Sequence, residues 1–378
     1  MTQVDIHQGD ALTVLRTLEP ASAHCCVTSP PYWALRDYGT GRWEGGEASC
    51  DHVRNHGVQG RNGQRADRSF TGQSVYGETC GKCGASRIDQ QMGLEDTPAE
   101  YVDKMVAVFA EVRRVLRHDG TLWLNIGDSY ANDGKLGGET GGKQSYLGDA
   151  DRKRVGREKR RTGLKPKDLV GIPWMLAFAL RSDGWYLRQD IIWHKPNAMP
   201  ESVKDRCTKA HEYIFLLSKS ERYYYDAEAV AEPASGVSGG ASFGPQKKIV
   251  VPSGWGVGKE PRTSVELLMQ GERRPPTYQS RTYERPVYEK RNRRSVWTVP
   301  TRSYKKAHFA TFPPKLIEPC ILAGCPKGGT VLDPFIGSGT TATVAQRLGR
   351  NCVGLELNPE YIDLANERLR GNQLELIA

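Results

Sequence analysis

The sequence lacks any run of 18 or more apolar residues, so we expect no segment that spans a membrane. Its first stretch, MTQVDIHQGD, lacks the basic and then apolar segments that mark a secretory signal. We therefore expect an intracellular, cytoplasmic protein of prokaryotic or phage-like type. In a reducing compartment its nine cysteines are expected to be thiols or metal ligands rather than disulfides.

Acidic residues are outnumbered, with 44 Asp and Glu against 53 Lys and Arg and a net charge of +9. A basic balance suits a polyanionic partner such as nucleic acid, although a soluble protein with a basic surface has the same signature. The 378 residues, 38% of them hydrophobic, suffice for a core domain with insertions. The 41 glycines and 22 prolines indicate long loops that interrupt this core.

Apolar patterning predicts strands that alternate with helices, which is typical of a doubly wound α/β sheet. The clearest helix is expected at 97–117, where Thr97, Pro98 and Glu100 form a capping signal and Gly120 ends the element. Further helices are expected at 168–182, 339–348 and 359–369. The buried strands are expected at 24–28, 121–126, 186–193, 212–217, 330–333 and 352–356.

The same patterning divides the chain into a core and insertions. We assign the core to 1–35, 94–225 and 301–378. Residues 36–93 are poor in aliphatic side chains, 131–167 are Gly-rich and then basic, and 226–300 are polar with little periodicity. These three segments are therefore interpreted as insertions.

A glycine-containing loop, Asp333-Pro-Phe-Ile-Gly-Ser-Gly-Thr-Thr341, follows a predicted strand and opens a predicted helix. Glycines there let the backbone approach a ligand, and Glu356 at the end of the next strand can accept hydrogen bonds from two ribose hydroxyls. The loop lacks the third glycine of a dinucleotide site and the Gly-Lys-Ser/Thr of a Walker loop. An adenosine without pyrophosphate therefore fits better, and S-adenosylmethionine is such a ligand; a purely structural turn is the alternative.

The tetrapeptide Ser29-Pro30-Pro31-Tyr32 follows the first buried strand. The exocyclic amino group of adenine or cytosine is a poor nucleophile because its lone pair is delocalised into the ring. The Ser29 hydroxyl and the Pro30 carbonyl can accept its N–H groups, and the prolines hold that carbonyl in place. Tyr32 can stack on a base flipped out of the duplex. The alternative is a Pro-rich turn at a strand end.

These two motifs, in this order, resemble the circularly permuted beta class of DNA amino-methyltransferases, the cytosine-N4 and adenine-N6 family. The resemblance implies a Rossmann-like, seven-stranded, mostly parallel sheet and binding of S-adenosylmethionine. It implies that Asp10 approaches the adenine and that Phe309, Thr311, Phe312 and Pro313 lie over the methionine end. Segment 226–300 would recognise the target sequence. The expected cofactor-binding residues are Asp10, Phe312, Asp333, Phe335, Gly337, Gly339, Thr340 and Glu356.

Within this family, Ser as the first residue of the tetrapeptide is more typical of enzymes that methylate cytosine N4. Asp or Asn at that position is more typical of enzymes that methylate adenine N6. We favour cytosine N4 and keep adenine N6 as the alternative. An RNA or protein methyltransferase and a non-catalytic DNA-binding protein stay open as further readings. Cytosine C5 chemistry needs a Pro-Cys nucleophile. Cys25 and Cys26 do not have that arrangement and are interpreted as buried strand residues.

The insertion 36–93 contains Cys50-x-His52 and Cys80-x-x-Cys83, a ligand set that suits structural zinc. Gly81 and Gly84 allow the tight knuckle of a tetrahedral thiolate site. Because the insertion has almost no apolar core, a metal could order it. His56 is a rival to His52, and unrelated thiols in a loop are the alternative.

Two basic segments are expected to contact double-stranded DNA, although solvated loops would have the same composition. Residues 152–167 hold nine Lys or Arg against one acidic residue, and 273–294 interleave arginines with Tyr278, Tyr283 and Tyr288. A homodimer and a cognate restriction enzyme remain open as partners. The expected DNA contacts are Arg152, Lys153, Arg154, Arg273, Arg274, Arg291, Arg293 and Arg294.

Overall fold

The computed structural model describes residues 2–33, 40–55, 73–75, 79–89, 91–131, 163–234, 290–301 and 312–377. The chain divides into one unit of Met1–Val230 with Arg294–Ala378 and a second unit of Ala231–Arg293. In the second unit, β10 (Glu232–Pro233) pairs antiparallel with β11 (Lys290–Arg291).

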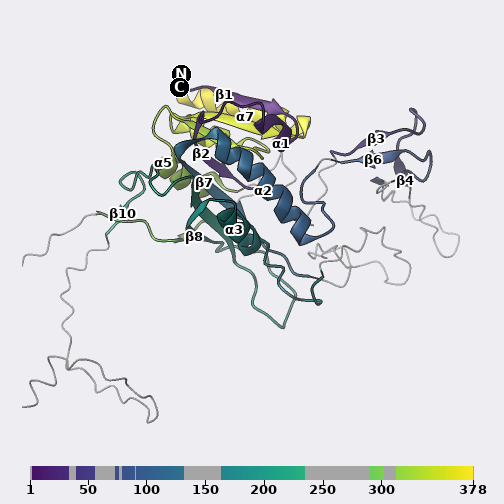
Figure 1. Ribbon diagram of the computed structural model, residues 1–378, viewed down its shortest axis with the longest axis horizontal. Helices are drawn as coiled ribbons and strands as arrows, with labels where there is room; N and C mark the ends of the chain where they lie inside the picture. The colour runs from purple at the N-terminus through teal and green to yellow at the C-terminus, as the bar shows by residue number, and fades with distance from the viewer. Residues whose placement is uncertain are drawn as a thin grey trace, which may run out of the picture. The chain divides into compact units, whose positions relative to one another are not determined.

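The first unit is built on an eight-stranded sheet (Figure 1). From one edge to the other its strands are β1 (Val4–Gln8), β14 (Asn351–Glu356), β13 (Thr330–Asp333), β2 (Ala23–Thr28), β7 (Leu116–Ile126), β9 (His211–Ser218), β8 (Tyr186–His194) and β12 (Val296–Thr298). Only β9 runs antiparallel to its neighbours in this sheet. The sheet contains one strand more than the seven expected. The additional strand is β12, a three-residue edge strand that is too short to give a periodic pattern.

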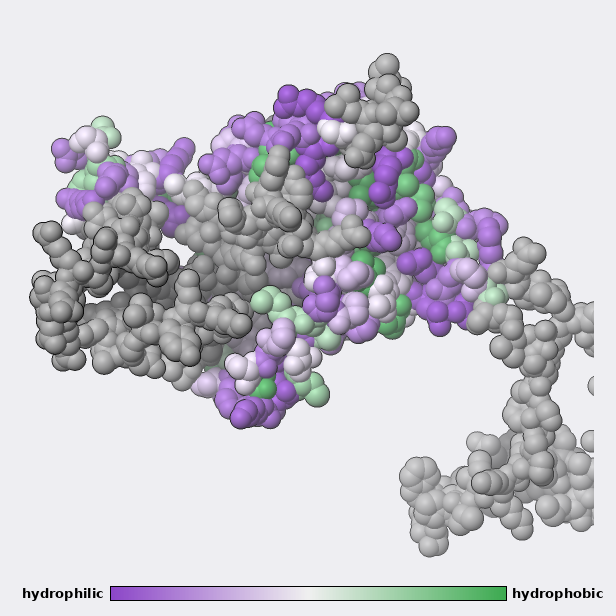
Figure 2. Space-filling model, turned by 180° about the vertical axis from the view of Figure 1, so that it is seen from behind, coloured by the Kyte–Doolittle hydropathy of each residue, from purple (hydrophilic) through white to green (hydrophobic). Residues whose placement is uncertain are grey.

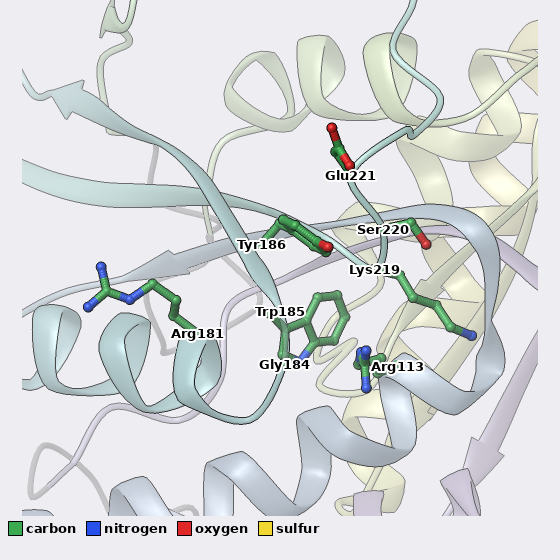
Figure 3. A pocket seen from close by; sticks show the side chains of 8 residues that line it. All are labelled: Arg113, Arg181, Gly184, Trp185, Tyr186, Lys219, Ser220 and Glu221. Carbon is green, nitrogen blue, oxygen red and sulfur yellow. The ribbon is translucent and has the colours of Figure 1, made fainter.

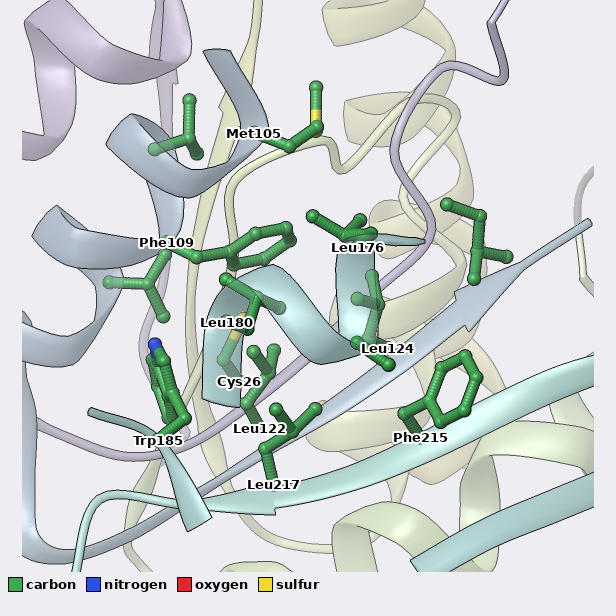
Figure 4. Close-up of a cluster of buried hydrophobic side chains, with 14 of the residues drawn as sticks. Cys26, Met105, Phe109, Leu122, Leu124, Leu176, Leu180, Trp185, Phe215 and Leu217 are labelled. Atoms are coloured by element: carbon green, nitrogen blue, oxygen red, sulfur yellow. The ribbon is translucent and has the colours of Figure 1, made fainter. Parts of the chain in front are cut away.

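Helices cover both faces of this sheet. They are α1 (Ala11–Leu15), α2 (Pro98–Val115), α3 (Ile172–Ser182), α5 (Pro314–Gly324), α6 (Thr340–Arg347) and α7 (Pro359–Ile377). Alternate side chains of one strand point to opposite faces, so Leu122 and Leu124 join α1, α2 and α3 in one core, whereas Trp123 joins α5 and α6 in another. Figure 4 shows the first core, with Phe109 of α2 and Leu180 of α3 above the strands.

The predicted helix at 97–117 begins as expected, because Thr97 caps it and its Oγ1 accepts from the Glu100 amide over 3.2 Å. It ends earlier than expected, at Val115. Leu116 is extended because it already pairs with Ala23 of β2, so β7 starts there and Gly120 lies within the strand. Cys25 and Cys26 are buried in β2, as predicted.

Two short antiparallel pairs form within the predicted Cys/His insertion. β3 (Arg42–Glu44) pairs with β6 (Ser86–Ile88), and β4 (Val53–Asn55) pairs with β5 (Gln73–Val75). Among the described residues, no helix has the length and apolar character needed to cross a membrane. On the face that Figure 2 presents, hydrophilic residues outnumber hydrophobic ones in the described part of the chain, with small hydrophobic patches between them.

Candidate active site

The two sequence motifs meet in the middle of the sheet, although they lie some 300 residues apart in the chain. β2 and β13 pair in parallel, with Cys25 opposite Val331 and Cys26 opposite Leu332. Their carboxyl ends are therefore side by side, and these ends carry Ser29 and the Asp333 loop. The carboxyl edge of a parallel sheet is where α/β folds bind ligands.

Asp333 is buried and holds the glycine loop together. Its carboxylate accepts from the Thr28 hydroxyl over 2.6 Å, the Thr341 hydroxyl over 2.6 Å and the Phe335 amide over 3.1 Å. Only 1% of the residue is exposed, and this burial raises the pKa of Asp333 to about 6, although the three hydrogen bonds oppose the rise. The buried carboxylate therefore stabilises the conformation of the loop through these three hydrogen bonds.

Two glycines give the loop its turn, and each has a different surrounding. Gly339 has φ +79°, and a Cβ there would lie only 2.8 Å from the Cβ of Ala365 in α7. Gly337 has φ +52° with open space where a Cβ would stand. Its amide donates to Glu356 Oε2 over 2.9 Å. A ligand can therefore approach the backbone at Gly337, while Gly339 lets the loop pack on α7.

Two acidic residues stand at neighbouring strand ends beside this loop. Gln8 of β1 pairs with Glu356 of β14, and the Gly9 amide donates to the Glu356 carbonyl over 2.9 Å. Asp10 follows directly and caps α1, accepting from the Thr13 amide over 2.9 Å. Burial raises the pKa of Glu356.

The other expected cofactor residues lie on the segments just described. Thr340 is buried at the first turn of α6, and its hydroxyl accepts from Arg368 over 3.1 Å. Phe335 is half-buried against the first core. Phe312 is half-buried and packs against the second core. Phe309 and Thr311 lie outside the described residues.

The tetrapeptide is held by groups on both of its sides. Ser29 is half-buried and Pro30 is buried. Tyr101 of α2 donates to the Pro31 carbonyl over 2.9 Å, and the Trp33 indole donates to the Glu95 carbonyl over 2.9 Å. These bonds hold the backbone of the turn that contains Pro30.

Tyr32 lies in a polar network of three strands. Its hydroxyl donates to Glu212 Oε2 over 2.8 Å, and Asn125 Oδ1 stands 3.3 Å away. Lys195 forms an ion pair with the other oxygen of Glu212. Burial raises the pKa of Tyr32 well above its ordinary value, and the Glu212 charge adds to the rise. A Cβ at Gly127 would lie 2.7 Å from the Tyr32 ring, so the ring is packed on bare backbone.

Sequence reasoning missed Thr28, Thr341, Asn125, Lys195 and Glu212. Their signal was a polar residue at or just beyond the end of an apolar strand, or in the first turn of a helix. Such residues are common at element ends. The neighbouring strands β2 and β13 bring Thr28 and Thr341 to Asp333, and the order of β7, β9 and β8 brings Asn125, Glu212 and Lys195 together.

The predicted metal ligands lie together, with all donor atoms of Cys50, His52, Cys80 and Cys83 within 4.8 Å of one another. Cys50 Sγ is 3.8 Å from Cys80 Sγ, and Cys83 Sγ is 3.6 Å from His52 Nδ1. A tetrahedral zinc with its usual bond lengths implies S···S of about 3.8 Å and S···N of about 3.6 Å. These two distances are therefore the ones expected between ligands of a shared zinc ion. The rival His56 lies outside the described residues.

The backbone of Cys80-Gly-Lys-Cys-Gly84 forms a tight knuckle around these sulfurs. The Gly84 amide donates to the Cys80 carbonyl over 2.8 Å, and the Lys82 amide points to Cys80 Sγ at 3.4 Å. Backbone amides of Glu47 and Ala85 lower the pKa of the Cys83 thiol. Trp43 stacks on the His52 ring with 4.5 Å between the ring centroids, which fixes the imidazole.

Of the predicted DNA contacts, three are described. Arg291 forms an ion pair with Glu232 over 3.1 Å across the β10–β11 ribbon. Arg293 is half-buried, and the Arg294 carbonyl accepts from the Trp297 indole over 2.7 Å. The other five, Arg152, Lys153, Arg154, Arg273 and Arg274, lie outside the described residues.

A separate pocket of about 430 Å³ lies where β8 begins and β9 ends (Figure 3). Because β8 runs in the same direction as β7 and β2, this is the edge of the sheet opposite the tetrapeptide. It therefore takes no part in the candidate active site. Its lining residues include Arg113, Arg181, Trp185, Tyr186, Lys219 and Glu221.

In a comparison with known proteins, one family model matches a stretch of the chain that contains both motifs. A family model for DNA methylases of the N6 and N4 type matches residues 23–367. The Type II methyltransferase M.Cfr9I of Citrobacter freundii is 41% identical, over 98% of this chain and 89% of the relative. M.XycI of Xanthomonas campestris pv. cyanopsidis is 42% identical over the same shares.

Among solved structures, the chain is similar to the PvuII DNA methyltransferase, described as cytosine-N4-specific. The TM-score is 0.52 at 17% identity, over 97% of this chain and 87% of that one. At this identity the likeness concerns the fold alone, and it confirms the expected Rossmann-like methyltransferase sheet.

Proposed function

This chain belongs to the N6/N4 family of DNA methylases, and we propose from that premise that it methylates the N4 amino group of cytosine in double-stranded DNA. That it is a DNA amino-methyltransferase follows from the family. The base is the proposal, and Ser29 in the first position of the tetrapeptide is the observation that carries it. Adenine N6 is the alternative acceptor.

The tetrapeptide would activate the acceptor nitrogen. The Ser29 hydroxyl oxygen and the Pro30 carbonyl accept the two N–H groups and draw the nitrogen lone pair out of conjugation. Tyr32 stacks on the flipped base, and the bonds to Glu212 and Asn125 keep its ring oriented. As the lone pair forms the new N–C bond, the bond between the methyl carbon and the sulfonium sulfur would break and leave its electron pair on sulfur. The amino group then loses one proton to the solvent. These residues supply positioning and electrostatics.

S-adenosylmethionine supplies a methyl group on a positively charged sulfur. The residues that would hold it are those at the carboxyl ends of β1, β13 and β14. Asp10 would lie at the adenine and Glu356 at the ribose. Phe335, Gly337, Gly339 and Thr340 would form the loop beside the ligand, and Phe312 would cover its methionine end. Asp333 acts through the loop, because its own oxygens already accept from Thr28, Thr341 and Phe335.

We propose that Cys50, His52, Cys80 and Cys83 hold a structural zinc ion. All four ligands come from the chain, so the site is closed and has no catalytic role. The knuckle contacts and the donor distances support this assignment. The ion would order an insertion that has almost no apolar core of its own.

We propose that segment 226–300 and the basic segment 152–167 contact DNA, the former for target recognition. Arginine is the commonest specific reader of guanine and also contacts phosphates. The relatives are named Type II methyltransferases. A restriction enzyme that recognises the same site is accordingly a proposed partner, and a homodimer is a second proposed assembly.

The first experiment is product analysis. The protein is incubated with methyl-labelled S-adenosylmethionine and unmethylated genomic DNA, which is then digested to nucleosides for mass spectrometry. N4-methylcytosine is expected. N6-methyladenine would retain the mechanism and reverse the base assignment. An absence of methylated nucleosides with the cofactor bound would overturn the proposed substrate, and RNA and protein acceptors are then compared.

A further inference from the structure

The segment between β8 and β9, residues 195–210, starts and ends at the carboxyl edge of the sheet that carries Tyr32. Lys195 at its start pairs with Glu212, which holds the Tyr32 hydroxyl. Near its end, Lys209 donates to the Asp128 carbonyl just beyond β7 over 2.8 Å. We call this segment the 195–210 loop. Its two ends therefore flank the place where a flipped base would enter.

The 195–210 loop is braced along its length. Asn197 both donates to the Thr301 carbonyl over 3.1 Å and accepts from the Thr301 amide over 2.9 Å. Arg206 forms an ion pair with Glu201 and lies over the Tyr130 ring, 3.9 Å from its centroid. These contacts fix the backbone of the loop from two sides before DNA binds.

Met199 is the most exposed large apolar residue of this braced loop. With 76% of its surface exposed, it exceeds every other large hydrophobic residue in the described part of the chain. Pro200 follows it and restricts its backbone to extended conformations, and Pro196 stands three residues before it. A rigid loop thus presents an unbranched thioether side chain to the solvent beside the active site.

The charge of the loop favours DNA as the partner of this side chain. Four cations, Lys195, Lys204, Arg206 and Lys209, stand against two acids, Glu201 and Asp205. Met199 is four residues from Lys195, so their Cα atoms are at most about 14 Å apart. Apolar side chains, methionine among them, enter the base stack of deformed DNA as wedges.

We propose that Met199 enters the DNA base stack and fills the space vacated by the flipped target base. This inference rests on the proposed function. A flipped base leaves a gap of two stacking steps, each about 3.4 Å high along the strand. A flexible, polarizable side chain fills such an irregular gap well. Filling it slows the return of the target base and leaves that base in contact with Tyr32.

The test compares two duplexes that carry the unmethylated form of the site that the wild-type protein methylates. In the first duplex, the target base is normally paired. In the second, it faces an abasic position, so no base pair has to be broken when it flips. We expect Met199→Ala to lower kcat/KM on the paired duplex by roughly tenfold, equivalent to about 1.4 kcal/mol. On the abasic duplex it should stay within about twofold of the wild type, because flipping there is already easy.

Two variants control this experiment. Met199→Leu keeps the apolar volume and should retain most of the wild-type rate on the paired duplex. Val203→Ala shortens the other exposed apolar residue of the same loop, which is 41% exposed. This variant should change kcat/KM to the same small extent on both duplexes. Thermal unfolding and cofactor affinity of each variant show whether the fold is intact.

The outcomes separate this inference from the proposed function. A loss of equal size on both duplexes, or no loss on either, would overturn the stacking role of Met199 while the wild-type protein still methylates DNA. A wild-type protein that methylates neither duplex would overturn the proposed function and the inference together.

Discussion

The hydroxyl of Thr28 donates a 2.6 Å hydrogen bond to the buried carboxylate of Asp333. This bond joins the strand that leads into the tetrapeptide to the strand that leads into the glycine loop. The two residues are 305 positions apart in the chain. Together with the pairing of β2 and β13, this bond couples the two motifs directly.

Thr28→Val tests this link. The variant keeps the shape of the side chain and removes a donor from a buried carboxylate, which costs about 1–3 kcal/mol of unfolding free energy. Cofactor affinity, measured by calorimetric titration, should fall as well because the loop loses one of its supports. Thr17→Val is the matched control, since the Thr17 hydroxyl bonds to the Val14 carbonyl at an exposed site. It should change stability by less than about 0.5 kcal/mol.

The burial of Asp333 predicts how stability depends on pH. Its pKa is about 6 in the folded chain against 3.8 for the exposed group, so between these values the folded state binds more protons than the unfolded state. The contribution of the protonated group is complete below about 3.8 and is lost as the pH rises through about 6. Its size is on the order of 2–3 kcal/mol.

Denaturant unfolding of the wild type and Asp333→Asn between pH 4 and 8 measures this contribution, because the other carboxylates cancel in the difference. The wild type should lose stability relative to the variant as the pH rises through this window and then level off. A difference that stays flat, or that rises with pH, would show that the folded-state pKa of Asp333 is not raised.

Much of the sheet was predictable, because buried strands such as β2 and β13 are short apolar runs followed by marked turns. The end of α2 and the strand β12 were not. Leu116 leaves the helix to pair with Ala23, and β12 has three residues whose strand character depends on β8. Both depend on partners distant in sequence, which local patterning does not contain.

The candidate site divides in the same way. The spacing of Cys50-x-His52 and Cys80-x-x-Cys83 was sufficient to predict that they lie together. The contact of Tyr32 with Glu212 was not predictable. It depends on the antiparallel register of β7 and β9, in which Asn125 faces Ile214 and Ile126 faces Tyr213.

We expect Tyr32 and Glu212 to be energetically coupled. Tyr32→Phe and Glu212→Gln should each lower kcat, and the double variant should lose less than the sum of the two. A coupling of about 0.5–3 kcal/mol is typical of residues in contact. Glu212 acts through Tyr32 as a positioning residue, so its effect should appear in the methyl-transfer step. Single-turnover rates on the paired duplex measure this step apart from DNA binding. Additive losses would contradict the network.

The zinc proposal predicts one ion per chain. Elemental analysis of protein purified without chelator should find stoichiometric zinc, and Cys80→Ser should lose it. The variant should also expose the insertion to limited proteolysis, because the metal supplies its ordering energy. Cys207→Ser is the control, since Cys207 is an exposed thiol outside the cluster and should retain the zinc. Wild-type protein without zinc would overturn the assignment.

The same substitution to alanine should affect Gly339 mainly through stability and Gly337 mainly through cofactor affinity. Gly339→Ala places a methyl group 2.8 Å from the Ala365 Cβ at a positive φ, so the stability of the fold should fall clearly, by about 2 kcal/mol or more. Gly337→Ala meets nothing within 4 Å and carries only the conformational cost of about 1 kcal/mol. Under the proposed function, its methyl group would point into the space that the cofactor occupies. Cofactor affinity should therefore fall further in Gly337→Ala than its stability does. Equal losses of affinity and stability in both variants would mean that the open side of Gly337 does not face the ligand.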